Sequence, residues 1–294
     1  MKFEKIAIIL TFFGLWLTSY FAEPSQNVFA FVLIFSVGIL HGSNDLGLIS
    51  ELNSRSKVKR LWYFVVSYLV TVCVASALFY FLPLLALICF IVFSAFHFGE
   101  QHWHHKFLHK ISGSHMFFFM YGYFILALLF YFNAHETNTI IFSLTGFKVP
   151  STLFMWNLIV SGVITLAWTG HAFYSRSLSM NTVLFEVFLI LVFSVVFKVA
   201  SLIWAFAIYF IIWHSVPSIL EQLSYLYGDR SAKALLRYVR ASWLIWVVSV
   251  TGIFGIYYWI ADSDTLFYPI FFALLGAITF AHVFTISKMF GSKT

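Results

Sequence analysis

Long apolar runs and short polar connectors alternate along the whole chain. A bilayer core about 30 Å thick requires about 20 mostly apolar residues per helix, and about ten runs of that length occur here. We expect them over residues 5–22, 27–45, 61–81, 84–100, 115–133, 151–173, 181–197, 199–220, 240–260 and 265–287. The pattern predicts an all-α polytopic membrane helical bundle of about ten transmembrane helices, within a range of about eight to ten. Because no connector is long enough for a soluble domain, we expect a single domain over residues 1–294.

The composition agrees with this fold class. Of the 294 residues, 62% are hydrophobic and 10% are charged, which is more apolar than a water-soluble core of this size requires. The net charge of +6 does not indicate a nucleic-acid partner, because the basic residues form short clusters between apolar runs. The 38 phenylalanines suit either a pocket for a long apolar ligand or a surface that faces lipid. We therefore expect the lipid bilayer as a partner and no nucleic acid.

The charged connectors predict an orientation. Alternate connectors are basic, from Lys2 and Lys5 through the segment 51–60 to the C-terminal lysines. The opposite connectors hold Glu23, Glu136 with Lys148, Lys198, and the pair Asp262 and Asp264, so nearly all the positive charge lies on one side. Basic connectors stay on the cytoplasmic side of a membrane. We expect a multi-pass protein of the cell inner (plasma) membrane with both termini in the cytoplasm.

Histidines recur at one position within the predicted helices. Every even-numbered helix has one near its cytoplasmic end; they are His41, His97, His171, His214 and His282. Histidines within a membrane are costly and tend to face a bundle interior. Each alone could bond a neighbouring carbonyl, but five at one depth favour a shared polar or metal site, since neutral imidazole is a common ligand of transition metals.

Polar residues follow three of these histidines at helical spacing. Asp45 follows His41 by four residues, Glu100 follows His97 by three, and Ser218 follows His214 by four. Residues three or four apart share a helix face, and a carboxylate beside a ligating imidazole can fix its tautomer. We expect Asp45 and Glu100 to orient histidine ligands; the alternative is that both only cap helix ends at the interface.

The stretch 97–109, "HFGEQHWHHKFLH", is the densest in histidine. It resembles the histidine boxes of membrane di-iron desaturases and hydroxylases, but the further H-x-x-H-H boxes of those enzymes are missing here. We interpret its later histidines mainly as surface loop residues, with His102 as an auxiliary metal ligand. Glu186 is the one acid in the middle of an apolar run, and the sequence offers it no partner, so it is a weak signal for a transporter.

Four short motifs carry a family resemblance: "GILHGSNDLGLI" around His41, "SAFHFGEQHW" around His97, "IYFIIWHSVPSI" around His214 and "AHVF" around His282. With them the chain resembles the Brp/Blh family of integral-membrane β-carotene 15,15'-dioxygenases, which supply retinal to microbial rhodopsins. The resemblance implies Fe(2+) held by histidines, O2 as co-substrate, and β-carotene or a related carotenoid as substrate, cleaved at its central 15,15' double bond. It also implies a functional link to a microbial rhodopsin.

The resemblance carries His41, His97 and His214 over as metal ligands. The family pattern has a further histidine four residues after the one in the eighth helix, where this chain has Ser218. Either three histidines suffice, or His282, His171 or His102 completes the site, or the activity has changed or been lost. Two other classes stay open: a membrane metalloenzyme that oxidises another lipid or terpenoid, and a non-enzymatic carotenoid- or retinal-binding protein or transporter.

Overall fold

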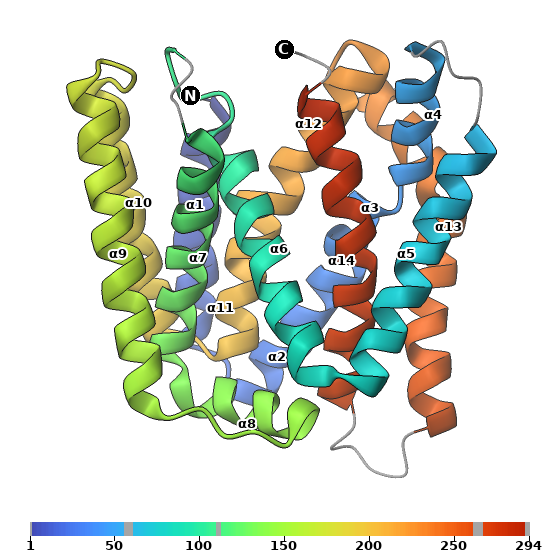
Figure 1. Cartoon of the computed structure of the whole chain (residues 1–294), viewed down its shortest axis with the longest axis horizontal. Helices are drawn as coiled ribbons and strands as arrows, with labels where there is room; N and C mark the ends of the chain where they lie inside the picture. Colours follow the sequence, from blue (N-terminus) through green and yellow to red (C-terminus); the bar gives the residue numbers. More distant parts are fainter. Residues whose placement is uncertain (1, 56–60, 110–112, 261–266, 292–294) are drawn as a thin grey trace. The chain divides into compact units, whose positions relative to one another are not determined.

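The computed structural model describes residues 2–55, 61–109, 113–260 and 267–291, and every regular element within these ranges is a helix (Figure 1). In them, eight segments are long and apolar enough to cross a membrane: Glu23–Leu52, Pro83–Trp103, Ser114–Phe132, Ser151–Tyr174, Met180–Val199, Leu202–Tyr227, Ala232–Trp259 and Phe267–Gly291. The predicted fold class is confirmed, and long apolar helices are typical of a membrane protein. The basic segment 56–60 and the pair Asp262 and Asp264 lie outside the described residues.

The described residues form two compact units. The first contains Met1–Leu33, Ser94–Thr139 and Lys148–His214. Its helices are α1 (Lys2–Thr18), α2 (Glu23–Leu33), the second half of α6 (Pro83–Trp103), α7 (Ser114–Phe132), the start of α8 (Ala134–Thr145), α9 (Ser151–Tyr174), α10 (Met180–Val199) and α11 (Leu202–Tyr209), followed by most of the π-helical turn η2 (Phe210–Ser215). Within this unit α7 and α9 lie side by side (Figure 1).

Two glycines let α6 and α7 approach closely in the first unit. A Cβ atom added to Gly99 of α6 would lie 1.8 Å from the Phe118 carbonyl oxygen of α7, and one added to Gly122 of α7 would lie 1.8 Å from the Ala95 carbonyl oxygen of α6. Small residues at a helix interface allow this backbone contact. Gly99 therefore sets the packing of the helix segment that carries His97.

The second unit contains Ile34–Phe93, Ile140–Phe147 and Ser215–Thr294. Its helical elements are the π-helical turn η1 (Ile34–Gly38), α3 (Ile39–Gly42), α4 (Asp45–Arg55), α5 (Leu61–Phe81), the first half of α6, the end of α8, α12 (Val216–Tyr227), α13 (Ala232–Ile260) and α14 (Phe267–Gly291). Helix α14 packs along α5 (Figure 1). One apolar cluster contains Phe79 and Phe280, and another contains Leu48 and Ile286, so His282 lies between two cores along α14.

Two π-helical turns mark departures from the sequence prediction. Residues 27–45 and 199–220 were each expected as a regular helix, but Ile34–Gly38 and Phe210–Ser215 are wound more widely. The first turn ends three residues before His41, and the second contains His214. Such turns are rare and often occur at functional sites, because they change the direction of side chains and release backbone carbonyls from the regular helical bonds.

Candidate metal centre

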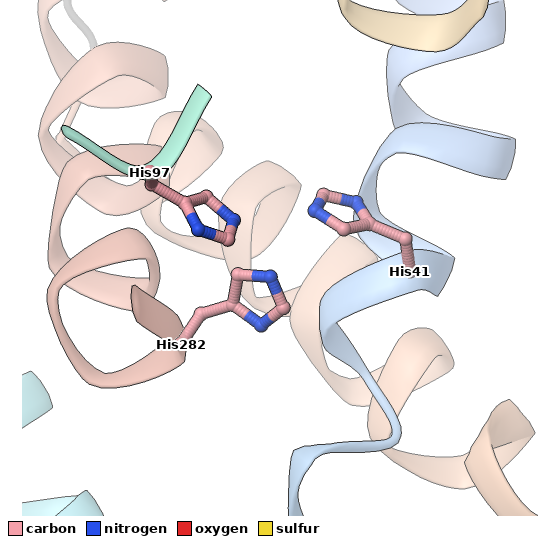
Figure 2. Close-up of side chains that lie close together, drawn as sticks. All are labelled: His41, His97 and His282. Atoms are coloured by element: carbon pink, nitrogen blue, oxygen red, sulfur yellow. The ribbon is translucent and has the colours of Figure 1, made fainter. Parts of the chain in front are cut away.

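In the second unit, His41 of α3 and His282 of α14 form a buried pair. Their ring centroids lie 4.8 Å apart, and the ring planes are nearly perpendicular at 88° (Figure 2). A Cβ atom added to Gly42 would lie 3.6 Å from His282 Nδ1, which is van der Waals contact distance. The backbone after His41 therefore lies close to the His282 ring. Side chains 241 residues apart in sequence therefore meet in the interior of one unit.

Each of these rings is held at Nδ1. His41 Nδ1 bonds the carbonyl oxygen of Gly38, which belongs to the π-helical turn, and His282 Nδ1 lies 2.8 Å from Asp45 Oδ1. A carbonyl and a carboxylate only accept hydrogen bonds, so both Nδ1 atoms carry the proton. In a neutral imidazole the lone pair then resides on Nε2, which is the atom that can bind a metal.

Asp45 has a different partner from the one expected. The spacing suggested that it would orient His41, but its carboxylate bonds His282 through Oδ1 and accepts a hydrogen bond from Tyr68 Oη at 3.0 Å through Oδ2. The reason is local. Helix α3 ends at Gly42, the Ser43 hydroxyl bonds the Ile39 carbonyl, and α4 begins anew at Asp45, so the four-residue helical spacing does not apply.

In the first unit, His97 of α6 and His214 of η2 form a second buried pair. Their ring centroids lie 4.7 Å apart at an interplanar angle of 78°. Phe98 and Phe210 pack against the His214 ring, with centroids 4.6 and 5.4 Å away. The buried amide of Gln101 donates a hydrogen bond to the His214 carbonyl oxygen at 3.0 Å. This pair is therefore fixed through both ring packing and the backbone.

Ser218, at the position where the family resemblance implies a histidine, is buried on α12. Its hydroxyl oxygen lies 3.2 Å from Gln222 Nε2, which also donates to the His41 carbonyl oxygen at 2.9 Å. The serine thus supports a glutamine that contacts the backbone of His41. Within the second unit it is His282 that lies beside His41.

The remaining candidates have separate environments. His171 is exposed on α9, with its ring beside Trp168, and therefore does not belong to the buried histidines. Glu100 is buried on α6, one turn after His97. His102 lies within α6 rather than in a loop, and its Nε2 is 2.8 Å from Glu186 Oε2.

Glu186, for which the sequence offered no partner, is the centre of a buried polar cluster in the first unit. Its carboxylate accepts from Lys106 Nζ at 2.5 Å and from Tyr121 Oη at 3.0 Å, and the His102 ring stacks on Tyr121. A carboxylate with a cation and a hydroxyl donor is satisfied as a buried ion pair. His102 therefore has a structural partner set of its own.

Sequence reasoning missed Tyr68, Gln222 and Tyr238. Tyr68 binds Asp45, while Gln222 and Tyr238 lie 2.9 and 3.0 Å from the His41 carbonyl oxygen. A glutamine within an apolar helix was a usable signal for Gln222, because buried amides need partners. One tyrosine among 15 gives no comparable signal.

The donor set fits a transition metal ion. The buried groups are imidazoles, which in their neutral form suit iron, copper and zinc, and the carboxylate bonded to His282 is the support that such ligands commonly have. Fold and site together define an all-α protein with membrane-length apolar helices and two pairs of buried histidines. The family model for beta-carotene 15,15'-dioxygenase matches residues 32–290, and the chain belongs to this family. Neither a curated protein nor a solved structure matches the chain.

Proposed function

We propose that the protein is a membrane-embedded, iron(II)-dependent dioxygenase that cleaves the central 15,15' double bond of β-carotene with O2 to give two molecules of retinal. Family membership supports a carotene dioxygenase. The observation that carries the proposal is the His41–His282 pair, whose two Nδ1 atoms are both engaged and whose Nε2 atoms are therefore the ligand atoms.

The proposed ligands are His41, His97 and His282, with His214 beside His97 as the fourth. The first three, drawn in Figure 2, are all buried, and each offers one ring nitrogen. In this proposal His282 takes the place of the histidine that Ser218 replaces. Asp45 orients His282, and Glu100 remains a candidate for orienting His97.

The surroundings of His282 include a side chain of α6. Phe93 of α6 packs against Phe280 and Phe284 of α14, with centroids 5.1 and 5.7 Å away, and these two rings flank His282 in sequence. His97 follows Phe93 by four residues on the same uninterrupted helix.

A bound ferrous ion with open coordination positions would supply the activation of oxygen. The side chains and backbone carbonyls of the protein orient the histidine ligands. Asp45 keeps a proton on His282 Nδ1, the Gly38 carbonyl does the same for His41, and the two rings thereby keep fixed orientations. Phe98 and Phe210 pack against His214 and exclude water from that side.

The family description supports a carotenoid as the substrate. A carotenoid hydrocarbon has no hydrogen-bonding groups, so its binding depends on buried apolar area, at about 25 cal/mol per Å², and on aromatic contacts. A site within the bilayer lets such a substrate enter from lipid. We propose the inner (plasma) membrane as the location, with both termini in the cytoplasm, and a microbial rhodopsin as the consumer of retinal.

Expression in a host that accumulates β-carotene tests the function. The wild-type chain should bleach the yellow colour and produce retinal, whereas His41→Ala, His97→Ala and His282→Ala should leave the colour intact. His171→Ala is the matched control, since this histidine is exposed, and it should behave as wild type. Persistent colour with abundant, folded wild-type protein would contradict the proposal.

A further inference from the structure

The wide turn before His41 is held from outside by side chains of another helix. Trp246 of α13 donates its indole N–H to the Phe35 carbonyl oxygen at 2.6 Å. Phe35 is the second residue of the π-helical turn η1, in which carbonyls are displaced from regular helical partners. A short bond from a large aromatic donor thus fixes the start of the turn.

The end of the same stretch has a second support. The hydroxyl of Tyr238, also on α13 and fully buried, lies 3.0 Å from the His41 carbonyl oxygen and 3.0 Å from Gln222 Oε1. Gln222 Nε2 donates to the same carbonyl at 2.9 Å. The backbone of His41 is therefore held by a phenol and an amide that also contact each other.

The two residues of α13 that hydrogen-bond to η1 and to His41 lie on one face of the helix. Tyr238 and Trp246 are eight residues apart, a spacing that keeps both within the stripe of a helix that faces its neighbour. Trp243 and Leu244, which lie between them in sequence but on another face of the helix, are exposed. The two donors span the π-helical turn and His41, one at each end.

We propose that Tyr238 and Trp246 are positioning residues for the metal centre: together they hold η1 in its π-helical form and thereby fix the direction of the His41 side chain. The inference rests on the proposed function in one respect, that His41 is a metal ligand. The link is direct, because the carbonyl that holds His41 Nδ1 belongs to Gly38, the last residue of the same turn. If η1 rewinds, that carbonyl moves away from the ring.

Two conservative variants and two matched controls test this. Tyr238→Phe removes only the hydroxyl, and Trp246→Phe removes the indole donor; Tyr258→Phe and Trp243→Phe make the same changes at exposed positions of α13. In metal-free protein, hydrogen exchange of residues 34–42 should become faster in the first two variants and stay unchanged in the controls. Titration with Co2+ should give about tenfold weaker binding and an altered visible spectrum in the first two variants only.

The outcomes separate the two proposals. Unchanged exchange in Tyr238→Phe and Trp246→Phe overturns the inference, as does a lower melting temperature with unchanged Co2+ affinity and spectrum, since a merely structural role would give that result. Wild-type protein that binds Co2+, shows the expected variant effects and leaves β-carotene intact contradicts the proposed function while supporting the positioning role. Wild-type protein that binds no Co2+ overturns both.

Discussion

The Asp45 carboxylate and the His282 imidazole lie 2.8 Å apart in a fully buried contact that joins the start of α4 to the middle of α14. A carboxylate at Nδ1 favours one tautomer and increases the basicity of Nε2. Tyr68 donates a hydrogen bond to the second carboxylate oxygen, and a buried acceptor of this kind is costly when it has no donor. Tyr68 thus holds the Asp45 carboxylate, and the carboxylate in turn holds the His282 ring.

Asp45→Asn should weaken metal binding. The amide keeps the shape of the side chain but loses the charge and one acceptor oxygen, so His282 is less firmly oriented, and we expect Co2+ affinity to fall about 10- to 100-fold. Tyr68→Phe should cause a smaller loss. Tyr80→Phe, at an exposed position of the same helix α5, should change nothing. Equal affinity in wild type and Asp45→Asn would remove the orienting role.

Ser218→Ala distinguishes a supporting residue from a ligand. In this proposal the Ser218 hydroxyl is not a metal ligand but accepts a hydrogen bond from Gln222. The variant should therefore bind Co2+ as wild type does. It leaves one buried amide N–H without its acceptor, which costs about 1–3 kcal/mol of stability. Metal titration and thermal unfolding in detergent measure the two effects. A loss of affinity with unchanged stability would identify Ser218 as a ligand.

The sequence predicted the helical fold, because membrane-length apolar runs leave few alternatives, and it predicted the buried histidines from their shared position. It could not predict that Asp45 would bond His282, since the break at Ser43 and Asn44 is a local backbone event and the partner lies on a distant helix. The π-helical turns were equally hidden, because nothing in an apolar run distinguishes a wide turn from a regular one.

His171 shows the limit of the depth argument. It lies near the end of its predicted helix as the other four do, yet its side chain is exposed, since position along a helix says nothing about which face the side chain occupies. Glu186 shows the converse: a carboxylate alone in an apolar run has its partners on other elements, where only the fold brings them together.

Gly99→Ala should destabilise the first unit. The new methyl group would lie 1.8 Å from the Phe118 carbonyl oxygen, so α6 and α7 must separate. Overpacking of this kind typically costs about 1–3 kcal/mol or more. Gly170→Ala is the control, because a Cβ atom there meets nothing within 4 Å and alanine is the better helix former. Thermal unfolding in detergent should show a lower midpoint for Gly99→Ala and an equal or higher one for Gly170→Ala; equal midpoints for Gly99→Ala and wild type would contradict the close contact.

Glu186→Gln should be among the more destabilising single changes in the first unit. It leaves Lys106, whose side chain is largely buried, beside a neutral amide and removes the carboxylate that His102 and Tyr121 contact. Breaking a buried ion pair by removing one partner costs about 3–5 kcal/mol, whereas replacing both partners by apolar residues is often nearly neutral. The double variant Glu186→Leu with Lys106→Met should therefore recover much of the loss.

The matched control for Glu186 is Glu136→Gln. Glu136 is half-buried, its carboxylate accepts the Leu202 N–H at 2.9 Å, and burial raises its pKa. An amide retains that acceptor and resembles the protonated acid, so the free energy of unfolding should change little. Denaturant unfolding in micelles compares the variants. If Glu186→Gln and Glu136→Gln proved equally mild, the Glu186 cluster would be a solvated surface group rather than a buried ion pair, and His102 would again be available as an auxiliary ligand.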